Sequence, residues 1–236
     1  MTEALFREDA YLRDCKAKVV ASGPAGIELD RSVFYPEGGG QPGDSGRLRL
    51  DDGRVVEIAN TRKGESADGI LHIPAEEGLV LEPGTPVVAE IDWERRHRHM
   101  RMHTAMHLLC GLVEGDVTGG QVGAEKSRLD FNLPDGPPDK AELQAALNAL
   151  VAADHRVAPR WIDEAELDAN PDLVRTLSVK PPRGSGRVRL LEIAGVDLQP
   201  CGGTHVRSTA EVGALTLGKI ENKGRQNRRF NLRLAD

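Results

Sequence analysis

The sequence is short of aromatic residues, of cysteine and of long apolar runs. Aromatic residues make up 3% of its 236 residues, so stacking of bases on aromatic rings cannot be the main way in which the chain binds nucleic acid. No segment approaches the unbroken apolar length of a membrane span, and the first ten residues lack the apolar core of a signal peptide. The three cysteines, Cys15, Cys110 and Cys201, are scattered and odd in number, which favours a reduced, cytoplasmic protein.

Positive charge does not dominate either, because the formal net charge is −6. This balance argues mildly against a nucleic-acid partner, but phosphate contacts depend on the local field rather than on the total charge. Basic residues gather in residues 95–101, 183–189 and 223–229. One such segment is typical of a solvated surface, whereas three of them favour an RNA partner. The expected phosphate contacts are Arg183, Arg187, Lys223, Arg225, Arg228 and Arg229.

The first 90 residues carry short segments in which apolar and polar side chains alternate between turns rich in Gly, Asp and Pro. The predicted strands are residues 15–21, 26–34, 46–50, 54–58, 69–73 and 86–91. Short strands at this spacing are typical of a small antiparallel barrel. We therefore predict an N-terminal β-barrel domain over residues 1–90.

Residues 91–236 mix both periodicities without a repeated strand–helix–strand pattern, which predicts an α+β domain. Apolar residues at helical spacing indicate an amphipathic helix over residues 141–153, and a second short helix is expected over residues 173–178. The predicted strands of this domain are residues 126–131, 187–193, 213–221 and 228–234, the last two forming a closing hairpin.

The densest group of candidate functional residues surrounds His103 and His107. These histidines lie four residues apart, so on a helix they project from one face, one turn apart. A pair of this kind is a common way to offer two nitrogens to one metal ion, although two helical histidines alone are more often surface or core residues. The intervening Thr104, Ala105 and Met106 include no carboxylate, which excludes the His-Glu-x-x-His arrangement of zinc proteases.

A second pair of candidate ligands, Cys201 and His205, follows on the Gly-rich segment 200–205. Together the two pairs offer one thiolate and three imidazoles, a ligand set that suits tetrahedral Zn²⁺. Four protein ligands would close a tetrahedron, whereas a catalytic zinc keeps one position open. Which ligand gives way to water or substrate is left open by the sequence.

Three motifs carry a family resemblance. His-Thr-Ala-Met-His-Leu-Leu at residues 103–109, Cys-Gly-Gly-Thr-His at 201–205 and the Gly-rich segment 34–46 resemble the AlaX family of free-standing alanyl-tRNA editing proteins. That family is related to the editing domain of alanyl-tRNA synthetase. The motifs occur in the same order and span most of the chain, and its length is that expected of the medium form.

The resemblance implies a function as well as a fold. It implies zinc-dependent hydrolysis of Ser-tRNA(Ala), and often of Gly-tRNA(Ala), with His103, His107, Cys201 and His205 as metal ligands. It also implies a barrel like the second domain of elongation factor Tu. Four glycines in six residues free the backbone of the Gly-rich loop to approach a ligand closely. The substrate-binding residues expected from these patterns are Gly38, Gly39, Gly40, Gln41, Arg225, Arg228 and Arg229.

Selectivity imposes a further requirement on the site, because serine differs from alanine by one hydroxyl group. A buried residue that hydrogen-bonds to the serine hydroxyl is left unpaired when alanine binds, which strongly disfavours alanine. Size exclusion cannot discriminate against alanine, because alanine is the smaller side chain. The candidates for this role are Gln121, which the resemblance places at the pocket border, and Thr104 on the metal helix.

Two alternatives remain open from the sequence. One is a zinc-stabilised RNA-binding module without catalysis. The other is the editing domain of threonyl-tRNA synthetase, which shares both metal-ligand spacings. The Gly-rich loop at residues 38–41 and the lack of a synthetase domain argue against the second alternative.

Overall fold

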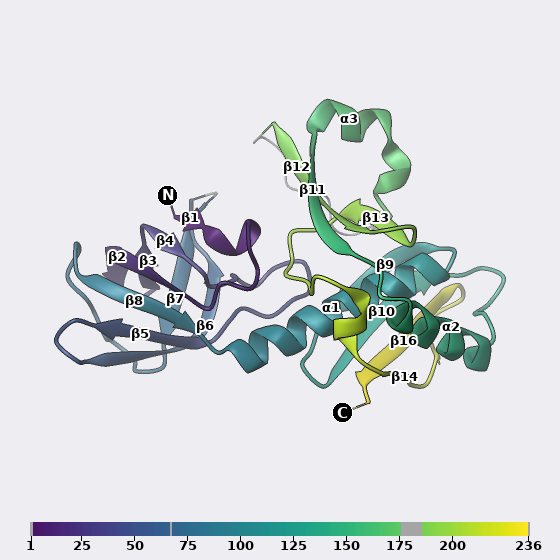
Figure 1. The fold of residues 1–236 in the computed structure, drawn as a ribbon, viewed down its shortest axis with the longest axis horizontal. Coiled ribbons are helices and arrows are strands. Elements are labelled where there is room, and N and C mark those ends of the chain that lie inside the picture. The colour runs from purple at the N-terminus through teal and green to yellow at the C-terminus, as the bar shows by residue number, and fades with distance from the viewer. Residues whose placement is uncertain (1, 67, 176–185, 236) are drawn as a thin grey trace. The chain divides into compact units, whose positions relative to one another are not determined.

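The structure, a computed structural model, describes residues 2–66, 68–175 and 186–235 (Figure 1). The chain divides into two units, Met1–His97 and Arg98–Asp236. The structure contains strands and a few helices, as the helical and strand periodicities of the sequence predicted. Among the described residues, no helix is both long enough and apolar enough to span a membrane.

The first unit contains a closed antiparallel barrel, which confirms the predicted architecture. Its strands follow each other around the barrel in the order β2-β3-β7-β6-β5-β8. Alternating side chains of these strands point inward and form a buried core that includes Val19, Leu48 and Val87. The strand bounds are β2 Asp14–Gly23, β3 Gly26–Leu29, β5 Gly46–Leu50, β6 Val55–Lys63, β7 Ile70–Pro74 and β8 Pro86–Ile91.

The predicted strand over residues 26–34 is wrong in one respect, because the structure breaks it at Asp30. The Asp30 carboxylate accepts a hydrogen bond from the backbone N–H of Lys18. Beyond this break the short strand β4 (Arg31–Ser32) leaves the barrel and pairs in parallel with β1 (Glu3–Ala4). The 3₁₀ turn η1 (Leu5–Arg7) follows β1.

A buried ion pair closes the core of the first unit. Arg96 and Asp44 have no exposed surface, and the guanidinium donates to both carboxylate oxygens. Arg96 also donates to the carbonyls of Ala10 and Val33, while Asp44 accepts the N–H of Tyr35. The basic segment 95–101, expected to face RNA, therefore sends its second arginine into the protein interior.

The second unit begins within the long helix α1 (Trp93–Leu112). Asp92 precedes this helix and its carboxylate accepts the N–H of Arg95, which is the bond of an N-cap residue. Helix α2 (Lys140–Ala152) matches the predicted amphipathic helix to within one residue at each end. Asp139 caps α2 through two backbone N–H groups, and Leu143, Leu147 and Val151 are its buried face.

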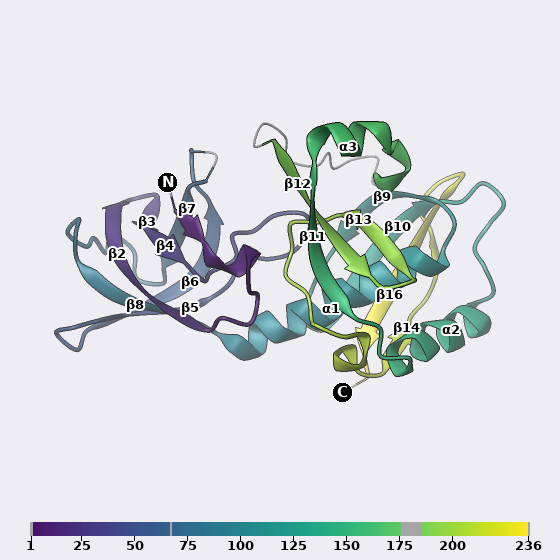
Figure 2. The ribbon, with the colours of Figure 1, turned by 45° about the horizontal axis from the view of Figure 1, so that its top comes forward.

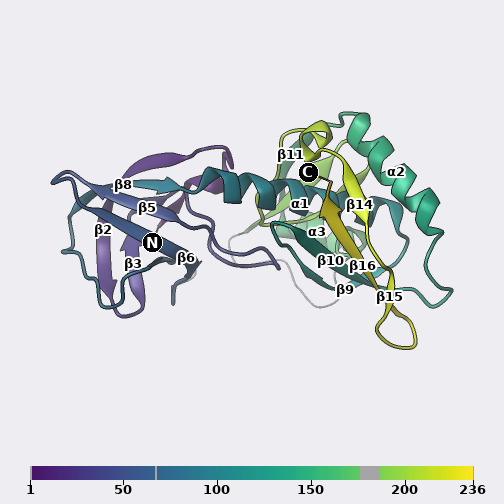
Figure 3. The same ribbon diagram turned by 90° about the horizontal axis from the view of Figure 1, so that it is seen from below.

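One sheet of the second unit contains β9 (Asp116–Gln121), β10 (Lys126–Asn132), β14 (Leu215–Leu217), β15 (Glu221–Asn222) and β16 (Asn227–Leu234). Its order is β14-β16-β10-β9, with β15 paired to β16 (Figure 3). Phe131 and Phe230 from its two central strands are fully buried. The predicted closing hairpin is confirmed by the antiparallel pairing of β14 with β16, but the predicted strand over residues 213–221 is wrong in its length, because it is interrupted at residues 218–220 between β14 and β15.

The other sheet of the second unit has the order β11-β12-β13. The strand β12 (Arg187–Ile193) was predicted, whereas β11 (Val157–Asp163) was not. The segment before Cys201, for which no strand was predicted, is the strand β13 (Asp197–Pro200). Figure 2 shows this sheet beside α1.

Short elements follow β11 and precede the last strands. They are α3 (Glu164–Ala169), η2 (Pro171–Leu173) and η3 (Thr209–Val212). The helix predicted over residues 173–178 is wrong at Val174, which has extended backbone after η2. Its remaining residues 176–178 lie outside the described part of the chain.

Candidate metal centre

Four side chains of the second unit converge on one point. The ligand atoms of His103, His107, Cys201 and His205 all lie within 4.8 Å of one another. The three histidines are 6–7% exposed and Cys201 is half-buried. The helix supplies the first pair at the predicted four-residue spacing, and the segment after β13 supplies the second.

The spacing of these atoms fits a tetrahedral ion. Nitrogen at about 2.1 Å and sulfur at about 2.3 Å from a tetrahedral zinc are about 3.6 Å apart. The Cys201 sulfur lies 3.7 Å from Nε2 of His103 and 3.2 Å from Nε2 of His205. The residues present therefore suit a divalent cation that accepts imidazole and thiolate ligands.

Close packing brings β13 against the helix. Gly111 lies one turn after His107 on α1, and a Cβ atom at Gly111 would come within 2.9 Å of both Val196 O and Val196 Cγ1. Any larger residue at Gly111 would push the strand away. Asp197, the first residue of β13, thereby reaches the imidazole of His107, which donates from Nδ1 to its carboxylate at 2.7 Å.

Asp197 is in turn held by Gln199, whose amide donates to the same carboxylate oxygen at 2.8 Å. Both residues are nearly buried. A carboxylate on the outer nitrogen of a ligating histidine fixes the tautomer and the ring orientation. Neither residue is among the site residues that the sequence predicted. The available signal was the alternation of Asp197, Gln199 and Cys201, which places all three on one side of a strand.

The backbone around Cys201 is fixed by Arg189 of β12. Its guanidinium donates to the carbonyls of Cys201 at 2.7 Å and Gly203 at 3.2 Å. The N–H of Gly203 lies 3.4 Å from the Cys201 sulfur and donates to it. The sequence assigned Arg189 to a basic segment, and the structure gives it a role in shaping the ligand turn.

Thr104 is buried against the metal centre rather than directed to solvent. It has no exposed surface, and its hydroxyl oxygen lies 3.2 Å from Nδ1 of His205 and 3.4 Å from the N–H of Val206. With Nε2 turned towards Cys201, Nδ1 is the nitrogen of His205 left to donate to Thr104. The structure therefore gives Thr104 the same outer position at His205 that Asp197 has at His107, and its expected role as a partner of the substrate hydroxyl remains a prediction.

The protonation of the cluster follows from burial and mutual interaction. Burial alone would raise the pKa of the Cys201 thiol, but the fields of His103 and His205 hold that pKa well below its usual value. Burial also lowers the pKa of His205 well below its usual value. At His107 burial acts to lower the pKa, and hydrogen bonds with Asp197 and Cys201 raise it to about 10. A thiolate is the state that a metal ion requires of Cys201, whereas His107 ligates only as the neutral imidazole, so binding of a metal would release its proton.

Comparison with known proteins identifies the family to which this arrangement belongs. A family model described as the threonyl and alanyl tRNA synthetase second additional domain matches residues 188–231. Another, described as tRNA synthetases class II (A), matches residues 6–95. The alanyl-tRNA editing protein AlaX-M of Methanosarcina acetivorans is 38% identical over 245 residues, with 100% of both chains covered. The chain belongs to the AlaX family.

Two further relatives extend the comparison. AlaX-M of Saccharolobus solfataricus is 33% identical, with 97% of each chain covered. The alanine–tRNA ligase of Sulfurisphaera tokodaii is 36% identical over 93% of the AlaX-family chain but only 25% of its own length. The chain therefore corresponds to one part of that longer ligase.

Gln121, the residue expected at the pocket border, ends strand β9 of the AlaX-family chain. Its side chain is exposed and its Oε1 accepts a hydrogen bond from Arg128 at 3.2 Å. The preceding Gly120 lies against the metal helix, since a Cβ there would be 3.3 Å from the end of Met106. Gln121 also lines a cavity of about 230 Å³ together with Val122, Gly123, Lys126, Ser127 and Arg128. Its role towards substrate remains a prediction.

The Gly-rich loop of the first unit is a tight turn. Gly38 and Gln41 exchange two backbone hydrogen bonds of 3.1 and 3.0 Å, and Gly39 and Gly40 have φ of 57° and 82°. Positive φ at both central residues is typical of a type I′ hairpin turn and explains the two glycines. Gln41 has no exposed surface. The expected contact of this loop with substrate remains a prediction.

The C-terminal basic segment is partly engaged within the AlaX-family fold. Arg229 donates two hydrogen bonds to Asp130, of 2.7 and 2.8 Å. Arg228 donates at 3.2 Å to the carbonyl of Gly224 in its own hairpin. Arg225 is exposed. Phosphate binding by these arginines remains a prediction.

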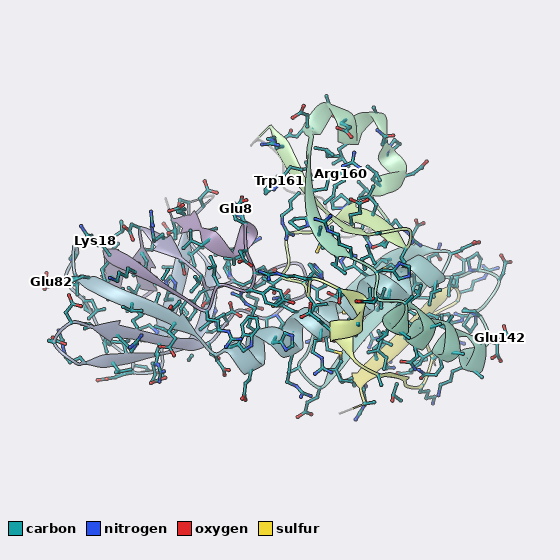
Figure 4. The ribbon with its side chains drawn as sticks, in the orientation of Figure 1. Glu8, Lys18, Glu82, Glu142, Arg160 and Trp161 are labelled. Carbon is teal, nitrogen blue, oxygen red and sulfur yellow. The ribbon has the colours of Figure 1, made fainter. Side chains whose placement is uncertain are left out.

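The other basic residues expected to contact phosphate differ in their surroundings. Lys223 forms an ion pair with Glu221 at 2.8 Å. Arg187 lies 6.0 Å from the ring of Trp161, which Figure 4 labels. Arg183 lies outside the described residues.

Proposed function

We propose that this AlaX-family chain removes serine and glycine from mischarged tRNA(Ala) by zinc-dependent ester hydrolysis. Alanyl-tRNA editing proteins are deacylases that act on mischarged tRNA, and the full-length match to them makes this chain such an enzyme with tRNA as its partner. The observation that carries the proposal is the convergence of three imidazoles and one thiol within 4.8 Å. The three free cysteines support a cytoplasmic location.

The residues of the cluster have distinct roles in this proposal. Zinc bound there supplies a Lewis acid for the ester carbonyl or an anchor for the amino group of the substrate. His103 and His107 present their nitrogens from a rigid helix. Cys201 is the least buried of the four ligands, so we expect the substrate to approach from its side.

The barrel of the first unit also fits the proposal. Its closed order of six antiparallel strands supports the predicted likeness to the second domain of elongation factor Tu. The tight turn at Gly38–Gln41 projects a small, side-chain-poor backbone that an RNA strand can approach closely.

Deacylation of Ser-tRNA(Ala), Gly-tRNA(Ala) and Ala-tRNA(Ala), each with and without a chelator, tests the activity. We expect hydrolysis of the first two, little hydrolysis of the third, and loss of activity on chelation that added zinc restores. RNA binding without hydrolysis of any ester would favour the non-catalytic zinc-stabilised module instead.

Selectivity is tested at Gln121, the exposed residue that follows the Gly120 packed against the metal helix. We predict that Gln121→Ala loses activity on Ser-tRNA(Ala), or loses its preference over Ala-tRNA(Ala), while it keeps its zinc. Removing a hydrogen-bond partner of a substrate hydroxyl costs on the order of 10²-fold in discrimination or more. Glycine has no hydroxyl, so its hydrolysis should change less; exclusion of the alanine methyl group would account for that substrate.

Thr104→Val provides the comparison for Gln121→Ala. Thr104 supports His205, so its loss should weaken zinc binding and slow all three esters together. A Gln121→Ala variant with the wild-type rate and wild-type discrimination would show that the hydroxyl partner is another residue.

A further inference from the structure

One face of the sheet that contains β10 and β16 is polar and basic. Residues directly opposite one another in an antiparallel sheet point to the same side. Lys126 is opposite Arg233, and Arg128 is opposite both Asn231 and Gln121. The other face bears Leu129 and its neighbours, which are buried in the core. We call Lys126, Arg128 and Arg233 the basic strip (Figure 3 shows its strands).

Two members of the basic strip are a cross-strand pair of like charge. Lys126 and Arg233 are exposed and are register partners on neighbouring strands. Like charges directly opposite in a sheet are destabilising. Within the described part of the chain, no carboxylate lies at salt-bridge distance from either residue. The fold therefore tolerates an unfavourable pair that an anion would relieve.

The acidic residues of the same face are engaged elsewhere. Asp130 holds Arg229 through two hydrogen bonds and lies 3.6 Å from Arg128. Glu221 pairs with Lys223 at 2.8 Å, and its charge also interacts more weakly with Lys126. These contacts neutralise the middle of the face and leave its Lys126–Arg233 end positive.

A cavity adjoins the positive end of the face. The cavity of about 230 Å³ at the β9–β10 turn is lined by Lys126 and Arg128 together with the polar Gln121 and Ser127. Arg98 of α1 binds the carbonyl of Ala124 in the same turn at 3.2 Å, which adds a third cation to this region. The exposed Glu125 is the acidic residue of the turn.

We propose that the basic strip binds the sugar–phosphate backbone of the tRNA substrate. The inference rests on the proposed function and names a surface for its substrate. The side chains of this face are polar or charged, whereas a protein partner would require an apolar centre in its interface. Cations without aromatic rings among them suit phosphates rather than unstacked bases.

The test compares tRNA(Ala) binding by the zinc-loaded full chain and its Lys126→Ala/Arg233→Ala variant. Uncharged tRNA(Ala) is used, so the result does not depend on hydrolysis. Between about 50 mM and about 200 mM salt, the slope of log K against log salt should fall by about 2 in the variant. Affinity at about 0.1 M salt should drop on the order of tenfold or more. The thermal midpoint should not fall, because the change removes a repulsion.

Matched variants separate the strip from total charge. Lys140→Ala/Arg160→Ala removes the same two charges from α2 and β11 (Arg160 is labelled in Figure 4), and it should keep the wild-type slope. Lys126→Arg should also bind as the wild type does. Equal slopes in the wild type and the Lys126→Ala/Arg233→Ala variant would overturn the proposal, as would an equal loss in the Lys140→Ala/Arg160→Ala variant.

Failure of the proposed function gives a different result. A wild-type protein that hydrolyses no mischarged tRNA, but whose RNA affinity depends on the basic strip, would reject the editing activity and retain this surface. A wild-type protein that hydrolyses Ser-tRNA(Ala), with RNA binding insensitive to the strip, would reject this surface alone.

Discussion

Each unit of the chain buries a polar cluster, and the two clusters use their hydrogen-bonding atoms in opposite ways. In the first unit Arg96 supplies donors and Asp44 supplies acceptors. The remaining donors of Arg96 meet the carbonyls of Ala10 and Val33. Donors match acceptors inside this cluster, so it is complete without a ligand.

The cluster of the second unit lacks this internal match. Nδ1 of His107 faces Asp197 and Nδ1 of His205 faces Thr104. In the state that ligates a metal, with neutral imidazoles and a thiolate, their Nε2 atoms and the Cys201 sulfur are therefore all acceptors, and they face one another. Lone pairs that face one another need a cation between them. Burial of polar side chains alone therefore does not indicate a metal site. Buried acceptors that converge on one point without donors between them do indicate one.

His72 of the first unit provides the same contrast with the ligand histidines in a single residue. It is as buried as the ligand histidines, but its Nδ1 meets the carbonyl of Ile27 at 2.9 Å and its Nε2 meets the hydroxyl of Ser32 at 2.7 Å. Both ring nitrogens are used within the protein. A neutral imidazole with Nδ1–H as donor satisfies both partners, which leaves no lone pair for a metal.

The largest expected effect comes from removing an unmatched acceptor. Cys201→Ala should abolish stoichiometric zinc binding and reduce deacylation by at least about 100-fold, more than loss of an outer partner of a ligand costs. Metal analysis and single-turnover rates on Ser-tRNA(Ala) measure both effects. Cys15→Ala removes a half-buried thiol from the first unit and should change neither. Full activity without bound metal in Cys201→Ala would contradict the comparison.

Substitution in the Arg96–Asp44 cluster should lower the stability of the protein and leave its metal content unchanged. Arg96→Met leaves the Asp44 carboxylate buried without its counter-charge, which costs about 3–5 kcal/mol of unfolding free energy. Denaturant unfolding measures the loss. Arg47→Met breaks the exposed ion pair with Glu90 and should cost at most about 1 kcal/mol. A loss at Arg96 no greater than that at Arg47 would show that the buried pair does not stabilise the first unit.

The histidine pair of the candidate metal centre and most of the barrel were predictable because each depends on local periodicity, whereas Cys201 and His205 were predicted from their spacing and from the family resemblance. His103 and His107 share a helix face by their spacing, and the barrel strands alternate between Gly- and Asp-bearing turns. Residues such as Arg96 were not predictable in the same way. It stands in a basic run that is typical of a surface, and only the distant Asp44 makes its burial possible.

The supporting residues of the centre depend on pairing between strands distant in sequence. Asp197 and Gln199 lie on a four-residue strand, too short for its alternation to stand out from a turn. That strand exists because β12 pairs with it. Arg189 reaches the Cys201 turn across the same pairing. Tertiary pairing, rather than local preference, therefore decided the part of the site that the sequence did not predict.

Lowering the pH should reduce the folding stability of the first unit, because His72 is buried as the neutral imidazole. Burial lowers the pKa of His72 to about 4, against an ordinary value of 6.5. Above pH 6.5 the imidazole is neutral in both states, so it imposes no penalty. Between these values the unfolded chain binds the proton and the folded chain does not, so stability falls as pH drops from 6.5 to 4. The full loss is about 3 kcal/mol.

The contribution of His72 is isolated by His72→Gln, which cannot titrate. Denaturant unfolding of both proteins at pH 7 and pH 4.5 gives the difference, and the wild type should lose more stability than the variant by about 2–3 kcal/mol. Equal losses would mean that His72 accepts a proton while folded.

The smallest expected effect concerns the orientation of one metal ligand by Asp197. Asp197→Asn keeps the shape of the side chain, but its amide can present a donor to His107 and no longer carries a negative charge. Loss of such an outer partner typically weakens metal binding by about 10–100-fold. Competition with a chelator measures the affinity of the variant directly, independently of deacylation. The visible spectrum of the cobalt-substituted protein reports ligand geometry and should change, because the His107 ring is no longer fixed.

Gln199→Ala removes only the support of Asp197 and should give a smaller loss of affinity in the same direction. Wild-type zinc affinity in Asp197→Asn would mean that the helix alone orients His107. The contact at 2.7 Å between His107 and Asp197 would then contribute nothing to metal binding, like the Arg96–Asp44 pair of the first unit.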